Sequence, residues 1–180
     1  MANNYIDNKK FYQAILDYQD LRGECEGRGE KAPRIPDFIG ECIIKIANNL
    51  SRLPKFAFYP IREEMVLDGV ENCIRYFNNF DPYKWKNPFG YFTMIIFRTF
   101  QRSIKTEKKR VYRKYKAIEE LGILDEDELL QDENGNMRQF QVYDNISEYI
   151  KTYEESDRKV KEKKKLKAKS KKVGLEVFFE

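Results

Sequence analysis

The sequence of 180 residues contains no histidine and only three cysteines. Histidine is the commonest general base and the commonest nitrogen ligand of metals, so the chain lacks the residue on which many catalytic sites depend. Cys25, Cys42 and Cys73 are widely spaced and include no CxxC pair, so they indicate neither a disulfide framework nor a zinc site. We expect free thiols, with Cys42 and Cys73 in the core, in a protein of a reducing cytoplasm.

Several other features of enzymes and membrane proteins are missing. There is no apolar run of about 20 residues and no signal peptide, so we expect no membrane contact. There is no glycine-rich phosphate loop and no nucleophile motif. The scattered acids Asp81, Asp125 and Asp127 fit no metal-binding motif. We therefore expect no catalytic residue, no metal site, no cofactor and no enzymatic activity.

The apolar residues that are present recur mostly at helical spacing. Such spacing predicts helices over 8–22, 37–50, 64–77 and from 88 onward, with a last helix after a cap at Asp144 or Asn145. Asn87 is a good helix cap and Pro88 suits a first helical turn. Residues 22–35, with three glycines and a proline, predict a loop. No stretch alternates as a strand would. The sequence predicts an all-α domain of about 110–120 residues with a less ordered, charged C-terminal third.

The segment 64–109 divides into an acidic and a basic half, separated by a short break rich in Asn, Asp and Pro. In the first half, Asp68, Glu71 and Asn72 lie away from a predicted apolar stripe. A polar, acidic patch of this kind is either a docking surface or a solvated face. The stripe consists of Met65, Val66, Gly69, Val70, Cys73, Ile74 and Phe77.

The basic half carries nine bases and one acid between residues 98 and 116. Arg98, Gln101, Arg102 and Lys105 are three and four residues apart, so they share one helix face. Such a face can neutralise phosphates, and Arg and Gln can read base edges in the major groove. Nearby aromatic residues offer stacking surfaces for unpaired bases. The alternative is a solvated basic helix whose aromatic residues lie in the core.

Charge is unevenly distributed in the C-terminal third. Residues 119–133 hold eight acids and no bases, which predicts a solvated loop or a screen for the basic helix. Residues 158–172 hold ten bases and one acid, which predicts a flexible linker or the frayed end of a helix. The hydrophobic residues that follow indicate an interaction site or, alternatively, a tail that packs on its own domain.

The ordered series of motifs between residues 61 and 110 resembles the promoter-binding core region of primary-type bacterial sigma factors. The matching positions are Asp68-Gly69, Ile74, Phe80-Asp81, Tyr91, Thr93, Ile96 and Arg98. The chain is most similar to the short late-transcription sigma factors of large tailed bacteriophages, which share a DGVE-type helix, an NFD…YKNP-type loop and a hydrophobic C-terminus. One departure is that Met94 and Ile95 stand where the family commonly has a pair of tryptophans.

This resemblance implies three sets of binding residues. The clamp helices of the largest subunit of host RNA polymerase would be bound by Asp68, Glu71, Asn72 and Arg75. Promoter DNA would be contacted by Tyr91, Thr93, Arg98, Gln101, Arg102 and Lys105. The phage sliding clamp would be bound by Leu175, Val177, Phe178 and Phe179.

The resemblance predicts a phage sigma factor in the host bacterial cytoplasm that recognises a −10-like late promoter element and connects polymerase to the clamp. A late co-activator is left open as a further partner. Two other readings stay open: a metal-dependent phage nuclease, and a DNA-binding regulator independent of polymerase. The expected organisation is a sigma-core-like domain over 1–117, an acidic loop and short helix over 118–157, a Lys-rich linker over 158–174 and a clamp-binding tail over 175–180.

Overall fold

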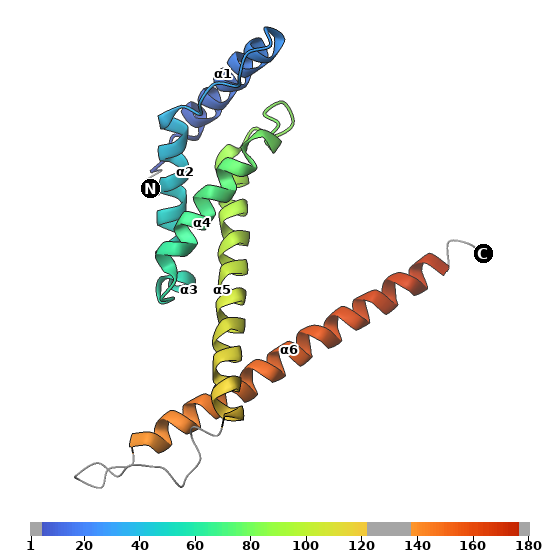
Figure 1. Cartoon of the computed structure of the whole chain (residues 1–180). Coiled ribbons are helices and arrows are strands. Elements are labelled where there is room, and N and C mark those ends of the chain that lie inside the picture. Colours follow the sequence, from blue (N-terminus) through green and yellow to red (C-terminus); the bar gives the residue numbers. More distant parts are fainter. Residues whose placement is uncertain (1–4, 122–137, 177–180) are drawn as a thin grey trace. The chain divides into compact units, whose positions relative to one another are not determined.

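The computed structural model describes residues 5–121 and 138–176, and the side chains of 5–121 and 145–166 (Figure 1). The fold is all-α, as the sequence predicts, and the described residues contain no strand. Two compact units, Met1–Thr106 and Glu107–Glu180, divide the chain inside its fifth helix. The functional division at residue 117 stays a prediction. The helices are α1 (Asn8–Gly27), α2 (Asp37–Ser51), α3 (Pro54–Ala57), α4 (Arg62–Arg75), the 3-10 helix η1 (Phe77–Asn79), α5 (Pro88–Glu120) and α6 (Arg138–Glu176).

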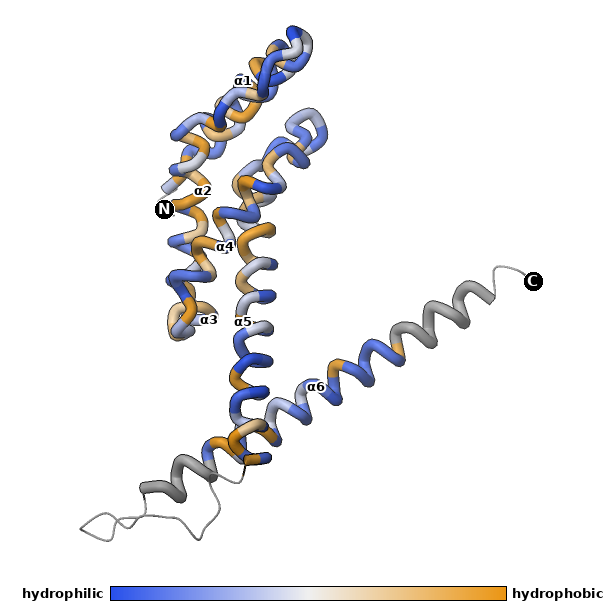
Figure 2. The backbone as a smooth tube through the Cα atoms, in the orientation of Figure 1, coloured by the Kyte–Doolittle hydropathy of each residue, from blue (hydrophilic) through white to orange (hydrophobic). Residues whose placement is uncertain are grey.

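The first unit is built around an aromatic and aliphatic core. Phe92 lies at its centre. The centroid of its ring is 5.7 Å from the ring centroids of Phe11 and Phe77 and 6.0 Å from that of Phe80. Isoleucines of α1 and α2 complete the core, and Cys42 and Cys73 are buried, as expected. Burial raises the pKa of the Cys73 thiol to about 12, so this thiol stays protonated at neutral pH. Figure 2 shows the apolar residues concentrated along α2 and the N-terminal part of α5.

Side-chain caps fix where α1 and α5 begin. Asp7 accepts hydrogen bonds from the backbone N–H groups of Lys9 and Lys10, which satisfies two donors that have no partner within the helix. Asn87 caps α5 as predicted, because its Oδ1 accepts from the backbone N–H of Gly90 at 3.0 Å. The backbone N–H of Phe89 donates to the Asn8 side chain, so the start of α5 is tied to α1.

The end of α1 lies further along the chain than the predicted end near residue 22. The helix runs through Gly23 to Gly27, and Cys25 is buried. The turn follows at Gly29, whose φ of 72° is easily adopted by glycine and rarely by other residues. The Glu30 N–H then donates to the Cys25 carbonyl at 2.9 Å and closes the helix end.

Gly69 allows α4 to pack closely on α5. A Cβ atom built at this position would lie 3.1 Å from side-chain atoms of Ile96 and Phe100, which are both fully buried. The buried line of α4 therefore runs through Met65, Gly69 and Cys73. The predicted stripe also included Ile74, but its side chain is 51% exposed. That part of the prediction was wrong, because Ile74 lies about 100° around the helix from Cys73.

Replacing Gly69 by Ala is expected to lower the free energy of unfolding by roughly 1–2 kcal/mol, because overpacking costs about 1–3 kcal/mol and exceeds the gain in helix propensity. Gly23→Ala in α1 is the control, since its Cβ would meet nothing within 4 Å. This control should be neutral or slightly stabilising. Urea denaturation of both variants measures the difference, and equal stabilities would contradict the close packing.

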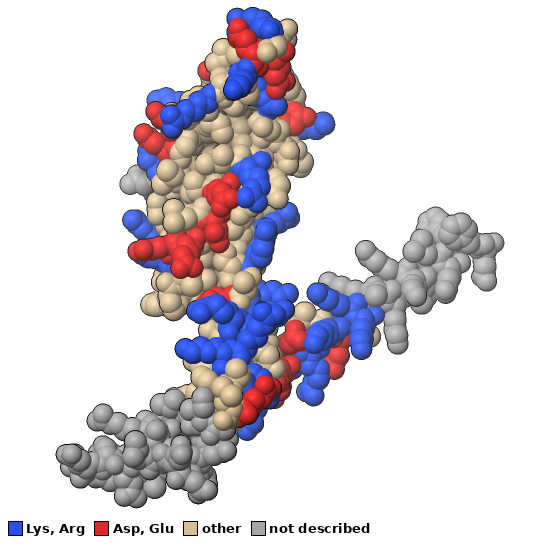
Figure 3. All heavy atoms as spheres, viewed as in Figure 1, with Lys and Arg blue, Asp and Glu red and all other residues tan. Residues whose placement is uncertain are grey.

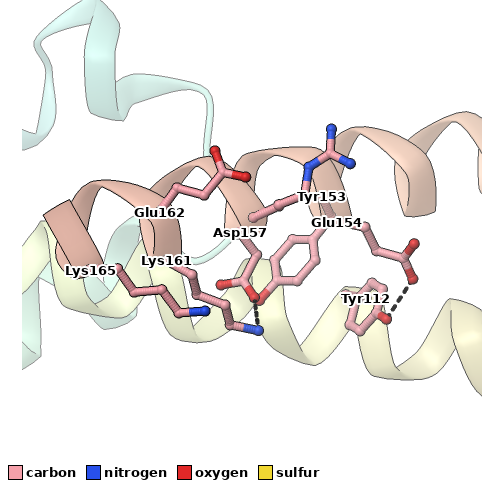
Figure 4. A pocket seen from close by; sticks show the side chains of 8 residues that line it. Tyr112, Tyr153, Glu154, Asp157, Lys161, Glu162 and Lys165 are labelled. Carbon is pink, nitrogen blue, oxygen red and sulfur yellow. Dashed lines mark hydrogen bonds and ion pairs between the residues drawn. The ribbon is translucent and has the colours of Figure 1, made fainter.

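In the second unit, tyrosine side chains connect the C-terminal part of α5 to α6 (Figure 4). The rings of Tyr112 and Tyr153 stack with their centroids 4.4 Å apart. The Tyr112 hydroxyl donates to the Glu154 carboxylate at 2.9 Å, and the Tyr149 hydroxyl donates to the Lys108 carbonyl at 3.1 Å. Ile146 is buried in the same unit.

Helix α6 is longer than the sequence predicts. It begins at Arg138, so neither Asp144 nor Asn145 caps it, and it continues to Glu176. The Lys-rich segment 158–172 is therefore part of a helix, which is one of the two forms that the sequence allowed. Most of the acidic block, residues 122–133, lies outside the described part of the chain.

Candidate functional site

The clearest candidate site is a basic face on α5 formed by Arg98, Gln101, Arg102 and Lys105. All four side chains are exposed. None of them has an ion pair or hydrogen bond to any residue that the structure describes. Several other cations of the protein are paired, as in Arg22–Glu26 and Arg110–Glu107. The basic face is thus free to bind phosphates or base edges from outside.

The packing of α5 determines that this face points outward. Phe92, Ile96 and Phe100 recur every four residues and are buried, together with Thr99. At 3.6 residues per turn, the basic face lies on roughly the opposite side of the helix. The structure therefore brings these four predicted DNA-binding residues together on one surface.

Tyr91 lies on the same side of α5 as Arg98 but is only partly accessible. The centroid of its ring is 5.0 Å from that of Phe80 and 5.2 Å from that of Phe92. Its hydroxyl donates to the Tyr76 carbonyl at 3.3 Å. Burial, with a smaller effect of Cys73, raises the pKa of Tyr91, so its hydroxyl stays a neutral donor. Tyr91 is held firmly, and the rest of its ring is left to contact a ligand.

Thr93 is not part of this surface. At 3.6 residues per turn it lies roughly 140° around the helix from Arg98. Its Oγ1 is buried and has no hydrogen-bond partner in the described residues. A contact between Thr93 and DNA is therefore not supported by its position, and the structure groups it with the packed side of α5.

The second predicted surface lies on α4 and is linked to α5 by a hydrogen bond. The exposed carboxylate of Asp68 accepts from Ser103 Oγ at 3.1 Å, and Ser103 belongs to α5. Glu71 pairs with Arg75 one turn further on, and the Asn72 side chain donates to the Asp68 carbonyl at 2.8 Å. The four predicted polymerase-binding residues therefore form one surface, and Asp68 connects it to α5.

Two apolar residues on α4 were not predicted as part of this surface. Leu67 is 70% exposed, and Ile74, which was assigned to the core, lies in solvent one turn beyond Glu71. If α4 binds a protein, this Leu and Ile would supply apolar contacts inside the polar rim that such surfaces have. The signal in the sequence was the position of Leu67 outside the apolar stripe.

The loop before α5 presents a further group of residues that sequence reasoning missed. Tyr83 is 79% exposed and Trp85 is 64% exposed, and Lys84 and Lys86 alternate with them. Exposed aromatic residues between lysines are suited to unpaired nucleotides, because the rings stack on bases and the ammonium groups attract phosphates. The alternation Tyr-Lys-Trp-Lys was a signal for this in the sequence.

The loop that carries Tyr83 and Trp85, here called the aromatic loop, is held in place by several hydrogen bonds. Asp81 accepts from the backbone N–H of Tyr83 at 3.0 Å and pairs with the Lys84 ammonium at 3.2 Å. Bonding to the Lys84 side chain, followed by the backbone N–H groups, lowers the pKa of Asp81. Tyr12 and Gln19 of α1 donate to the carbonyls of residues 82 and 80. The exposed rings therefore project from an ordered support.

The remaining predicted site lies at the C-terminus. Val177, Phe178 and Phe179 are outside the described residues, and Leu175 belongs to α6 with its side chain not described. The proposed clamp-binding role of these four residues stays a prediction. In the described part of the chain, no group of three metal-binding side chains is found, and no helix is long and apolar enough to cross a membrane.

A scan against protein-family models and a search of curated proteins both find no match to this chain.

Proposed function

We propose that this protein is a bacteriophage sigma factor for late transcription. It binds the core of host RNA polymerase through α4, recognises a −10-like late promoter element through α5 and connects the polymerase to the sliding clamp through its C-terminus. It catalyses no reaction itself and needs no cofactor.

The observation that best supports the proposal is the direct packing of the two helices that carry these surfaces in the first unit. Helix α4, which carries the polar surface, contacts the packed side of α5 through the Asp68–Ser103 hydrogen bond and the close approach at Gly69. The basic face of α5 lies on the other side of the same helix. A sigma factor must place a DNA-binding helix at a fixed position relative to polymerase. Two helices packed directly on one another, one for each partner, meet this requirement.

The aromatic loop supports the same proposal. In an opened promoter the bases of one strand are unpaired, and Tyr83 and Trp85 offer exposed rings for stacking. The loop leads directly into α5, whose basic face would contact the adjoining duplex. These two rings supply aromatic surface in a chain that has Met94 and Ile95 at the positions of the family's tryptophan pair.

Asp68→Lys is expected to weaken binding to core polymerase by about tenfold or more, because it places a like charge where an acidic contact is proposed. Ser103→Ala is the matched control, since it removes the hydrogen bond to Asp68 and leaves the carboxylate in place. The control should bind polymerase nearly as well as the wild type. Co-purification and titration with labelled core polymerase measure both variants.

The outcomes of this experiment separate the proposal from its alternatives. Equal binding by Asp68→Lys and the wild type would place the polymerase interface elsewhere. Absence of any binding by the wild type would favour a regulator that is independent of polymerase. Metal-dependent cleavage of DNA by the purified protein would instead indicate a nuclease. Both variants should keep the melting temperature of the wild type within a few degrees, since the altered side chains are at the surface.

A further inference from the structure

After Ile150, no described residue of α6 belongs to the buried core of the second unit. The tyrosine contacts end at Tyr153, and the next residues on that side of the helix are Asp157 and Val160. Val160 is 46% exposed and Leu166 is 67% exposed. Most helices in proteins are stabilised by packing of an apolar face, so this part of α6 needs another source of stability.

The same part of α6 carries a high density of positive charge. Segment 158–172 holds ten bases and one acid, Glu162. In the described portion, Lys161 pairs with Asp157 at 2.7 Å. The other described cations are exposed and have no partner among the described residues. They are Arg158, Lys159, Lys163, Lys164 and Lys165. Figure 3 shows Lys and Arg side chains gathered on the coloured part of α6, with Asp and Glu beside them.

Such a helix is unfavourable in water but well suited to a polyanion. Like charges four residues apart, such as Lys159–Lys163 and Lys161–Lys165, each destabilise a helix by a few tenths of a kcal/mol. The segment nevertheless contains no glycine or proline and consists mostly of Lys, which is a good helix former. Neutralising the ammonium groups would remove the repulsion and leave a sequence that favours a helix.

The arrangement of the charges indicates which polyanion fits. Arg158, Lys161, Lys164 and Lys165 form one row, and Lys159 and Lys163 form a second row on roughly the opposite side of the helix. The major groove of B-DNA is wide enough for an α-helix and has a sugar–phosphate backbone on each side. Two rows of cations on opposite sides of one helix therefore match two phosphate backbones.

We propose that residues 158–166 of α6 bind the phosphates of duplex DNA without regard to base sequence. This surface belongs to the second unit and differs from the basic face of α5, which includes a glutamine and arginines suited to base edges. The proposal does not depend on the sigma-factor function, because it requires only the protein and DNA. If both hold, α6 adds a DNA contact that is independent of the promoter sequence.

The test is the salt dependence of binding to a duplex of about 24 base pairs without a promoter. The variant replaces Lys159, Lys163, Lys164 and Lys165 with Gln, and its binding is followed by fluorescence anisotropy between about 50 and 200 mM KCl. If each lysine neutralises one phosphate, the plot of log K against log salt becomes shallower by about 3.6, at about 0.9 per phosphate. The melting temperature should not fall, since these side chains are exposed and their removal relieves repulsion along the helix.

The matched control removes four exposed cations of the first unit, which gives the same change in net charge. Its substitutions are Lys31→Gln, Arg34→Gln, Lys45→Gln and Arg52→Gln. The proposal expects the control to keep the salt dependence of the wild type. Equal slopes for the α6 variant and the wild type, or equal reductions in the variant and the control, would overturn it.

A third arm uses vesicles of phosphatidylserine in place of DNA. The proposal expects that any vesicle binding is weaker than duplex binding and that the α6 substitutions reduce duplex binding. Vesicle binding that the α6 substitutions abolish, with duplex binding unchanged, would assign the surface to anionic membranes and overturn the proposal.

Discussion

Replacing Arg98, Arg102 and Lys105 together with Gln is expected to abolish nearly all promoter-directed transcription while leaving folding and polymerase binding intact. The three side chains are exposed and have no partner in the described structure, so their removal should cost little stability. Each lost base contact is expected to cost about 1–3 kcal/mol, which is roughly 5- to 150-fold in binding. Run-off transcription measures the effect, and the melting temperature reports on folding.

The matched control changes to Gln three exposed cations that have no partner among the described residues and lie outside this face. They are Lys31, Arg34 and Arg52. It should transcribe as well as the wild type, because it alters net charge equally but leaves the basic face intact. Similar losses in both triple variants would show that only net charge matters.

Single substitutions on the basic face separate reading of bases from contact with phosphates. Arg98→Ala should relax specificity at one promoter position, whereas Lys105→Ala should weaken binding to all promoter sequences alike. Identical profiles for the two variants across a set of substituted promoters would contradict this division of roles.

Deleting residues 175–180 is expected to abolish stimulation of transcription by the sliding clamp. Buried aromatic anchors commonly carry most of the energy of such contacts, and the deletion removes both Phe178 and Phe179. The advantage of the tail is one of effective concentration, since it holds polymerase near DNA that carries the clamp. Basal transcription without the clamp and binding to polymerase should stay at the wild-type level.

Phe178→Ala with Phe179→Ala is a milder form of the same test, because it keeps the length of the chain. It should lose clamp-dependent stimulation as the deletion does. If either change prevents polymerase binding or lowers the melting temperature by many degrees, the tail is part of the fold and the prediction fails.

The sequence predicted the all-α class and the start of α5 because these depend on local signals. Asn87 and Pro88 mark a helix start through chemistry that involves only neighbouring residues, and the structure confirms the cap. The basic face was predictable for the same reason, since the spacing of Arg98, Arg102 and Lys105 determines that they share a side of α5.

Other features depend on contacts between distant residues and were missed. Three glycines lie within residues 22–35, and only the backbone of the structure shows that the turn is at Gly29. The exposure of Ile74 depends on which side of α4 faces α5. Gly69 determines that side, because only a residue without a side chain allows the helices to approach so closely there. The exposure of Trp85 depends on bonds from Tyr12 and Gln19 that hold the loop against α1.

The most direct test of the sigma-factor proposal is run-off transcription with host core polymerase, the purified protein and a late promoter template, with and without the loaded sliding clamp. The proposal predicts a specific transcript that requires this protein and increases when the clamp is present. Wild-type protein that binds core polymerase but yields no promoter-specific transcript, with or without the clamp, would contradict the proposal.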